Sequence, residues 1–435
     1  PRSRRPRTVT AAEAVGRAGD WKRLKDWITD SGVDTSDITT EVAPTELGKG
    51  ELGLVTTQKM EPGDILAWTP SSLLLNKGKA VEKWGELVQD LPDRLAIAVF
   101  LLHERLVEGS KSTWAPYWDT LPKWNGDVSG PSFLWEEDEW EYLEGSDGFA
   151  ASVQMARAVE KEYESLKPLF AQHPATFPPE VFTYENFVWA SAVIASRAYG
   201  DDSEGSYLSI APLVDFLNHG PGSLQLTRFG NGIVAYAHKH YDAGEEVYVS
   251  YGGKNNAQLI TQYGFVVESN DQESVYLRMD EHLFIQEPRL EAKRRLLSEL
   301  LGEDDRDPNT AIFRVATRQR EWIAQLIPAL RVLALSEDDQ VPESVRDLAA
   351  TMPPKHEAAA WDLLAKALQR RLEEYPFPLE DHRKQLAEEP PWADNIPERK
   401  RLGLRLLISE QELIQLALGI ARENKDTALA ALQTA

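Results

Sequence analysis

Residues 250–265, SYGGKNNAQLITQYGF, combine aromatic rings, glycines, a lysine and two asparagines in one short segment. The Gly-Gly-Lys triplet is similar to part of a phosphate-binding loop. A P-loop requires G-x-x-x-x-G-K-[ST], however, and this segment lacks both the spacing and the final Ser or Thr. The pattern instead predicts a strand, a glycine turn and a helix over residues 257–263, capped by Asn255 or Asn256 and ended by Gly264.

Secondary structure alone does not explain the aromatic residues Tyr251 and Tyr263, which stand at the two ends of this compact unit. A second polar group ends an apolar segment in 212-PLVDFLNHG-220, where Asp215, Asn218 and His219 follow one another closely. Buried polar groups need hydrogen-bond partners, so we expect a ligand or another chain segment to supply them. A helix-capping turn would account for Asn218 alone.

Three glycines in 48-GKGELGL-54 would let the backbone approach a ligand closely, or would simply form a flexible turn before a strand. Around these motifs, strands are predicted at 42–75 and 205–270, and helices between and after them. Glu61-Pro62-Gly63-Asp64 reads as a hairpin turn, and Ser409-x-x-Glu412 as the capping box of the final helix. A β unit split by helices implies that distant segments meet to form one site.

Composition limits the function classes. The 435 residues carry a formal net charge of -23, which disfavours nonspecific nucleic-acid binding and either attracts a basic partner or serves solubility alone. Cysteine is absent, so disulfides and thiolate metal sites are excluded, and His238 and His240 lack a third ligand nearby. No apolar run is long enough to predict a membrane span. The basic start, PRSRRPRTVT, reads as a transit-peptide remnant or a disordered end.

Taken in order, the motifs resemble the SET-domain protein methyltransferases: G-x-G-x-x-G, then Asn-His, then a strand ending in Tyr-Gly, then a helix ending in Tyr-Gly-Phe. Three further segments are similar to the helical insert of the Rubisco large-subunit methyltransferase group, which also includes actin-histidine and related lysine methyltransferases. These segments are 114-WAPYWDTLPK-123, 133-FLWEEDEWEYLEGS-146 and 184-YENFVWASAVIASRAY-199.

The resemblance implies an α+β fold: a SET-domain β fold with a pseudoknot, split by a helical insert and followed by a C-terminal all-helical substrate-binding domain. The expected boundaries are 1–39 for an N-terminal helical extension, 40–80 and 191–275 for the two parts of the SET domain, 81–190 for the insert and 276–435 for the helical domain. The active site is expected in 191–275.

The resemblance also implies roles for individual residues. Tyr251 matches the catalytic tyrosine. The positions that match contacts to S-adenosylmethionine are Gly50, Glu51, Leu52, Gly53, Ser196, Arg197, Asn218 and His219. Asp215 matches a substrate-side polar position, and Tyr263 and Phe265 match aromatic residues of the target-lysine channel. No metal is implied. Asp201 and Asp202 stand where the plant enzymes have a basic residue, which leaves the substrate open.

The expected reaction is methyl transfer from S-adenosylmethionine to a lysine amine. Deprotonating lysine at pH 7 costs roughly 4–5 kcal/mol, and an aromatic channel lowers this cost by removing water from the ammonium and aiming the amine. A tyrosine hydroxyl at the junction can orient the amine, and aromatic walls tolerate methylammonium groups through cation–π contact.

Two alternatives remain open: histidine methylation, and a catalytically silent SET module that binds a partner through its C-terminal helices. The partner implied is a non-histone protein such as the Rubisco large subunit, bound by a monomer, without nucleic acid or membrane. The expected compartment is the chloroplast in a photosynthetic source, and otherwise the cytoplasm or nucleus.

Overall fold

The computed structural model describes residues 22–31, 40–44, 52–122, 130–200, 208–220, 226–229, 232–280, 290–301, 310–316, 321–336, 339–344, 348, 352–387 and 398–434. They divide into two compact units. The first comprises Pro1–Trp135, Ser152–Gly253 and Thr261–Gly264, and the second comprises Glu136–Ala151, Lys254–Ile260 and Phe265–Ala435.

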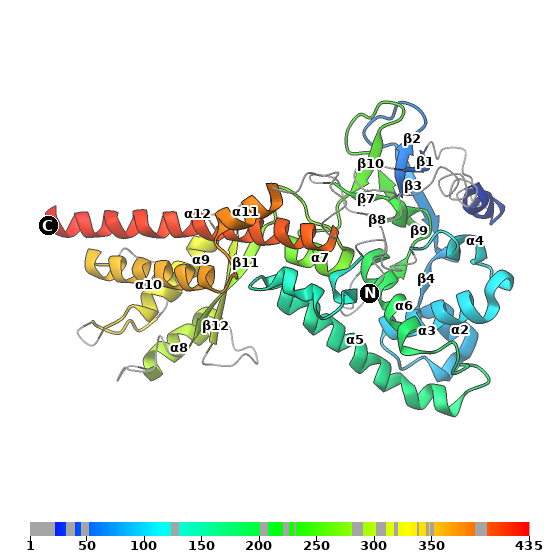
Figure 1. Ribbon diagram of the computed structural model, residues 1–435, viewed down its shortest axis with the longest axis horizontal. Helices are drawn as coiled ribbons and strands as arrows, with labels where there is room; N and C mark the ends of the chain where they lie inside the picture. The colour runs from blue at the N-terminus through cyan, green and yellow to red at the C-terminus, as the bar shows by residue number, and fades with distance from the viewer. Residues whose placement is uncertain are drawn as a thin grey trace. The chain divides into compact units, whose positions relative to one another are not determined.

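The first unit contains three small sheets, each of which joins an early segment of the chain to a late one (Figure 1). The first sheet has the order β1 (Thr40–Pro44), β2 (Leu52–Thr56), β10 (Glu246–Val249) and β7 (Asn218–His219). The second has the order β3 (Ile65–Pro70), β9 (Gly232–Tyr236) and β8 (Thr227–Phe229), and the third β4 (Leu75–Asn76), β6 (Ser209–Ile210) and β5 (Ala198–Tyr199). The expected meeting of segments distant in sequence is confirmed.

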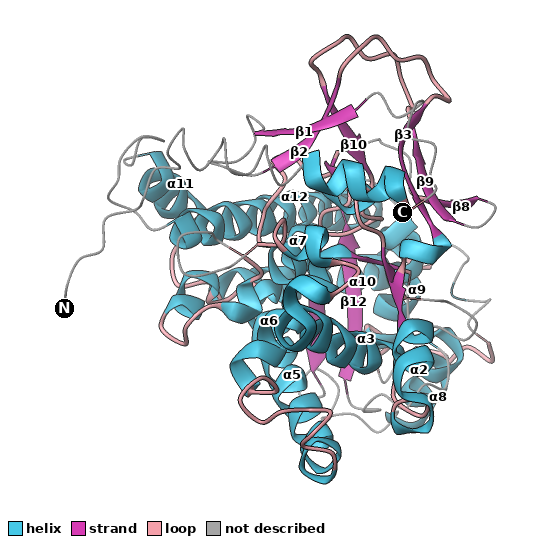
Figure 2. Cartoon of the chain, turned by 90° about the vertical axis from the view of Figure 1, so that its right-hand side faces the viewer, coloured by secondary structure: helices cyan, strands magenta, loops and turns pink. Residues whose placement is uncertain are grey.

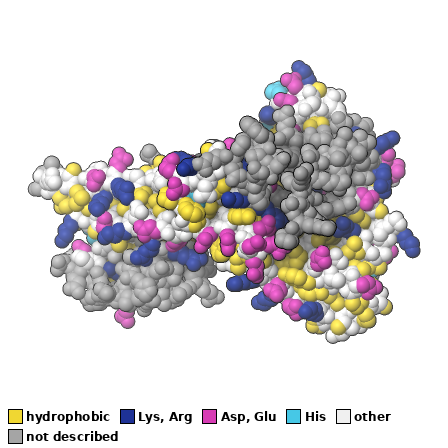
Figure 3. All heavy atoms as spheres, viewed as in Figure 1, with side chains coloured by type: hydrophobic (Ala, Val, Ile, Leu, Met, Phe, Trp, Pro, Cys, Tyr) yellow, Lys and Arg dark blue, Asp and Glu magenta, His cyan; other side chains and the backbone are white. Residues whose placement is uncertain are grey.

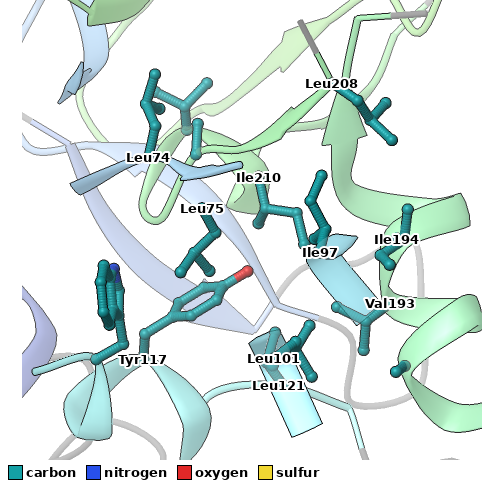
Figure 4. Packing of buried hydrophobic residues seen from close by; sticks show 14 of the residues in the cluster. Leu74, Leu75, Ile97, Leu101, Tyr117, Leu121, Val193, Ile194, Leu208 and Ile210 are labelled. Atoms are coloured by element: carbon teal, nitrogen blue, oxygen red, sulfur yellow. The ribbon is translucent and has the colours of Figure 1, made fainter. Parts of the chain in front are cut away.

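One helix of the first unit, over residues 22–30, precedes β1. The others lie along the chain between the early and late strands: α2 (Lys77–Trp84), α3 (Asp93–Leu102), α4 (Ala115–Trp118), α5 (Asp147–Gln172), which begins in the second unit, and α6 (Tyr184–Arg197). Eight of the ten residues of α3 are buried, and α3 packs against α6, as Figure 2 shows. In Figure 4 the side chains of these two helices meet those of β4 and β6. This core fixes the end of α6, where Ser196 and Arg197 stand.

The second unit is largely helical, as expected, and its helices α10 (Pro354–Glu373) and α12 (Glu398–Thr434) lie side by side (Figure 1). Its other helices are α8 (Leu290–Leu301), α9 (Glu321–Leu333) and α11 (Leu379–Ala387), and it holds the first part of α7 (Asn256–Tyr263). The unit is not wholly helical, because β11 (Ser274–Asp280) pairs antiparallel with β12 (Thr310–Ala316). Acidic and basic side chains are interspersed on the face of this unit seen in Figure 3.

Two local expectations were wrong. Glu61–Asp64 does form a turn, closed by the Asp64 N–H donating to the Glu61 carbonyl at 3.0 Å, but β2 and β3 on either side belong to different sheets and form no hairpin. Ser409 and Glu412 lie inside α12, which begins at Glu398, and so do not cap its start. None of the described helices has the length and apolar character needed to cross a membrane.

Candidate active site at the junction of β7 and β10

The centre of the candidate site is a parallel pairing between two short segments. Tyr248 of β10 lies opposite Asn218 of β7, Val249 lies opposite His219, and the Gly220 N–H donates to the Val249 carbonyl at 3.0 Å. This pairing brings the Asn-His motif beside the chain that continues into Ser250 and Tyr251. It is the local contact that the expected pseudoknot requires.

Tyr251 is held on both its main chain and its side chain. Its N–H donates to Nδ1 of His219 at 3.1 Å, and its hydroxyl donates to the Leu217 carbonyl at 2.9 Å. The ring is half-buried and lies 5.3 Å from the His219 ring. Because the hydroxyl proton points to Leu217, the oxygen can act toward a ligand as a hydrogen-bond acceptor.

Tyr263, at the end of α7, stacks on Tyr251 with ring centroids 4.7 Å apart and planes 28° apart. Burial raises the pKa of the Tyr263 hydroxyl to about 12, so this group is neutral at physiological pH. The two tyrosines of the opening motif therefore come together. The resemblance implied this by placing both beside one channel. Phe265 is half-buried and falls in the second unit, and its role in the channel stays a prediction.

The helix between these tyrosines forms as the sequence indicated. Asn255 is the N-cap, because its Oδ1 accepts from the Gln258 N–H at 2.9 Å. Asn256 instead donates to Glu273 Oε2 at 2.5 Å and to the Val267 carbonyl at 3.0 Å. Gly264 ends the helix with a φ of 82°, a conformation that favours glycine.

Asn218 donates its side-chain amide to Glu246 Oε1 at 2.8 Å, while Tyr248 donates its hydroxyl to Glu246 Oε2 at 2.8 Å. Glu246, two residues before Tyr248 on β10, thus orients both the Asn218 and the Tyr248 side chain. Sequence reasoning did not single out Glu246, and its place in an ordinary EEVYV strand gives no signal for it.

Asp215 lies in a 3-10 helix, Val214–Phe216, where a strand was expected. Leu213, just before it, has a φ of 84°, which is strained for a non-glycine residue and is maintained here by complete burial. Backbone strain of this kind gathers at functional sites. It turns Asp215 inward, so that the carboxylate is only 1% exposed.

Arg197 pairs with Asp215. Its Nη1 donates to Asp215 Oδ2 at 3.0 Å and to the Asp215 carbonyl at 3.1 Å. Burial alone would lower the pKa of Arg197, but Asp215, Tyr117 and Tyr251 together outweigh burial and raise it, so the guanidinium stays charged. Burial also raises the pKa of Asp215, against the effect of Arg197.

Tyr117 completes this group from the helical insert, donating its hydroxyl to Asp215 Oδ2 at 2.5 Å. Two buried polar atoms of the pair, Asp215 Oδ1 and Arg197 Nε, have no hydrogen-bond partner among the described residues. Tyr117 was not predicted as a site residue. The signal was present in the segment WAPYWDTLPK, but nothing local in it points to a partner 98 residues away.

The remaining predicted cofactor residues are placed as follows. Gly50 and Glu51 lie outside the described residues. Leu52 and Gly53 begin β2, which pairs with β10. Ser196 donates its hydroxyl back to the Ala192 carbonyl of its own helix at 2.8 Å.

Comparison of the sequence with models of known protein families identifies the fold. The SET-domain family model matches residues 51–252, and a second model, described as Rubisco LSMT substrate-binding, matches residues 286–414. Residues 51–252 are a SET domain. This domain contains β2, the helical insert, and the β7–β10 junction with Asn218, His219 and Tyr251.

Solved structures share this SET-domain fold. A crystal structure of the SET domain of LSMT bound to lysine and AdoHcy matches with a TM-score of 0.77 and 23% identity, over 94% of this chain and 92% of that one. A structure of Rubisco LSMT bound to AdoMet matches with a TM-score of 0.75 and the same identity, over 94% and 93%.

Curated relatives of this SET-domain protein carry a different name. The actin-histidine N-methyltransferase of Homo sapiens is 24% identical over 407 residues, and that of Gallus gallus is 24% identical over 438 residues. The alignment covers 86% of this chain and 64% of the human relative, and 94% and 70% for the chicken relative. The chain thus spans somewhat less than two thirds of the human relative's length.

Proposed function

We propose that this protein transfers a methyl group from S-adenosylmethionine to the side-chain amine of lysine in a non-histone protein. The observation that carries the proposal is the placement of Tyr251. Its ring stacks on Tyr263, its hydroxyl proton is donated to Leu217, and its main chain is fixed to His219. A narrow aromatic wall with one acceptor oxygen suits an alkylammonium, which carries donors only.

The polar groups beside this tyrosine fit the cofactor. The amino-acid part of S-adenosylmethionine carries an ammonium and a carboxylate, which complement a buried acceptor and a buried donor. Arg197 Nε offers a donor for the carboxylate and lacks a partner among the described residues, while Asp215, whose Oδ1 also lacks one, keeps the substrate-side role that the resemblance implied. Arg197, Asn218 and His219 would hold the cofactor, which when bound supplies an electrophilic methyl group on a sulfonium.

The chain's own residues would prepare the amine. Stacked aromatic rings remove water from the lysine ammonium, which lowers its pKa and favours loss of a proton to solvent. The Tyr251 oxygen then orients the neutral amine, which forms the new N–C bond as the S–C bond breaks, leaving S-adenosylhomocysteine. Tyr251 acts by position, because a hydroxyl of pKa near 10 is a poor general base at neutral pH.

Histidine methylation is the second candidate, supported by the names of the curated relatives. An imidazole is wider than an alkyl chain and needs a hydrogen-bond partner for its second nitrogen. The acceptor character of Tyr251 and the small Val214 beside Asp215 favour lysine. The substrate protein itself, the Rubisco large subunit or another basic target, would dock on the region that matches the substrate-binding family.

The test uses methyl-tritiated S-adenosylmethionine and a hypomethylated cell extract, with wild-type protein and Tyr251→Phe in parallel. Labelled bands are hydrolysed to find the modified amino acid. Label on lysine that falls at least about 100-fold in the variant supports the proposal. Label on histidine replaces it with the second candidate. Absence of both label and cofactor binding contradicts a methyltransferase function.

A further inference from the structure

We propose that Glu246 is a positioning residue that fixes the side-chain amide of Asn218, so that the amide oxygen can accept a hydrogen bond from the ammonium group of S-adenosylmethionine. The inference deepens the proposed function and rests on it. A side-chain amide has an oxygen that accepts hydrogen bonds and a nitrogen that donates them, so its orientation decides which kind of ligand group it can bind.

The three polar side chains involved lie on one face of the β7–β10 pairing. Asn218 lies opposite Tyr248 on the parallel strand, and Glu246 precedes Tyr248 by two residues, so the three side chains share a face of the sheet. Glu246 Oε1 accepts from Asn218 Nδ2 at 2.8 Å, and Glu246 Oε2 accepts from the Tyr248 hydroxyl at 2.8 Å. Both oxygens of the carboxylate are thus engaged, and the bond from Tyr248 limits its rotation.

The Glu246 carboxylate decides which end of the Asn218 amide faces it. An ionised carboxylate accepts hydrogen bonds and donates none, so it must face the nitrogen of the amide and not the oxygen. Because the amide is planar, Oδ1 then lies on the side turned away from the carboxylate. A side chain without an acceptor at position 246 would remove this preference and let the amide rotate.

Asn218 lies in the chain between the two residues that hold Tyr251. The Leu217 carbonyl accepts from the Tyr251 hydroxyl, and His219 Nδ1 accepts from the Tyr251 N–H. The ammonium of the cofactor carries donors only, so it requires an acceptor such as Oδ1 and is not bound by the N–H₂ end of an amide. With Arg197 Nε as the donor for the cofactor carboxylate, both charged groups of its amino-acid part would have a partner.

The test is calorimetric titration of two ligands into wild-type protein and Glu246→Met. One ligand is S-adenosylhomocysteine, and the other is its analogue in which hydrogen replaces the amino group. We expect the affinity of the variant for S-adenosylhomocysteine to fall about 10-fold or more, the effect of a hydrogen bond to a charged group. Affinity for the analogue should change little, because it has no ammonium for Oδ1 to bind.

An equal loss of affinity for both ligands would mean that Glu246 only maintains the local fold, and would overturn the inference. Glu246→Ala, which also lacks an acceptor, takes the place of Glu246→Met if that variant folds poorly. In turnover, KM for S-adenosylmethionine should rise more than kcat falls, because the proposed contact is to the ammonium and not to the methyl group that is transferred.

Glu246→Gln is the conservative variant, and it should retain most of the affinity for S-adenosylhomocysteine. The glutamine oxygen can accept from Asn218 Nδ2 while the glutamine nitrogen donates to the Tyr248 hydroxyl oxygen, so the Asn218 amide keeps its orientation. If the glutamine variant bound as weakly as the methionine variant, the charge of Glu246 and not the orientation of the amide would set the affinity. That result would also overturn the inference.

Glu245→Met is the matched control for the loss of charge. Glu245 directly precedes Glu246, is exposed, and accepts from the Asp242 N–H at 2.8 Å. The control removes the same charge from the same part of the chain, and we expect wild-type affinity for both ligands. A loss as large as that of Glu246→Met would assign the effect to net charge and contradict the inference.

The wild-type titrations separate the inference from the proposed function. Wild-type protein that binds S-adenosylhomocysteine and its analogue equally well would not recognise the ammonium, which overturns the inference alone. Wild-type protein that binds neither ligand overturns the proposed function itself.

Discussion

At the scale of single residues, the buried hydroxyl of Tyr263 makes the stability of the protein depend on pH in the alkaline range. Burial raises the pKa of Tyr263 to about 12, while the unfolded chain titrates near 10. Between these values the folded state holds a proton that the unfolded state has lost, so stability falls as pH rises. Tyr263→Phe should reduce this slope by up to about 1.4 kcal/mol per pH unit.

The measurement is urea unfolding of both proteins at several pH values from 9 to 12. Below pH 9 the two curves should keep a constant separation. A slope unchanged by the substitution would mean that Tyr263 ionises as easily in the folded protein as in the unfolded chain, and would contradict its burial against Tyr251.

The sequence predicted those site residues that belong to recognisable motifs occurring in a fixed order along the chain. Asn218 and His219 were found because polar residues that follow an apolar segment demand partners, and the junction supplies them. Tyr251 was found through the order of the motifs that carry the resemblance. Tyr117 and Glu246 were missed because their importance arises from contacts with Asp215 and Asn218 that no local pattern encodes.

At the scale of elements, the end of α7 depends on Gly264. Its φ of 82° is strained for other residues, and a Cβ there would overlap the backbone of Gly130. Gly63 has a φ of 98° but open space around it. We expect Gly63→Ala to cost about 1–2 kcal/mol, the left-handed strain alone, and Gly264→Ala to cost clearly more.

Chemical denaturation of the two alanine variants measures this difference in the free energy of unfolding. The rate of methyl transfer by Gly264→Ala shows whether the neighbouring Tyr263 is displaced. Similar costs in the two variants would show that the Gly130 backbone yields easily. In that case Gly264 would be needed for its conformation only.

A π-helical turn, His103–Glu108, follows α3 and contains two buried polar residues, His103 and Glu104. His103, Glu104 and Glu108 are close enough to hold a metal ion, but the Lys83 ammonium lies 2.5 Å from Glu104 Oε1 and 3.0 Å from Glu108 Oε1. Lys83→Met would leave Glu104, whose side chain is 7% exposed, as a buried charge without its cation, although the Ser112 hydroxyl still donates to Oε2 at 2.6 Å. We expect a loss of about 3–5 kcal/mol.

Thermal unfolding of Lys83→Met beside Lys161→Met measures this loss. Lys161 is exposed on α5, and its substitution should change stability by less than about 0.5 kcal/mol. If Lys83→Met were as stable as wild type, the Lys83 ammonium would contribute nothing measurable to the stability of the folded protein.

Helices and strands with strong periodicity were predicted correctly, and the misses have physical causes. The Ser409-x-x-Glu412 pattern fits a capping box, yet the Ser409 hydroxyl donates to Glu273 Oε2 at 2.5 Å inside a helix that began at Glu398. Leu106 follows the spacing of the buried stripe on α3 but is 40% exposed, because the π-helical turn changes the residues per turn there.

At the scale of the whole molecule, the net charge of -23 should steer basic substrates. We expect KM for a basic protein substrate to rise several-fold between 50 and 300 mM salt, since ions screen such attraction. KM for S-adenosylmethionine should change much less, because buried contacts are screened weakly. A protein-substrate KM that is independent of salt would assign the acidic surface to solubility alone.

The division into two units was the least predictable feature. Motif order indicated a SET domain and a helical region, and both are present. It did not indicate that residues 136–151 and 254–260 belong to the second unit, because that assignment depends on packing between segments far apart in sequence.

The pairing of β10 with both β2 and β7 has a consequence for how the protein is made. Val247 pairs with Leu54, and Val249 with His219, so three distant segments must assemble before Tyr251 has its partners. At 5–20 residues per second, the ribosome produces β10 roughly 10–40 s after β2. During that interval β2 has an open edge that attracts other strands. Cells should therefore need a chaperone for this chain early in its synthesis, and enzyme activity should appear late, after both units have been completed.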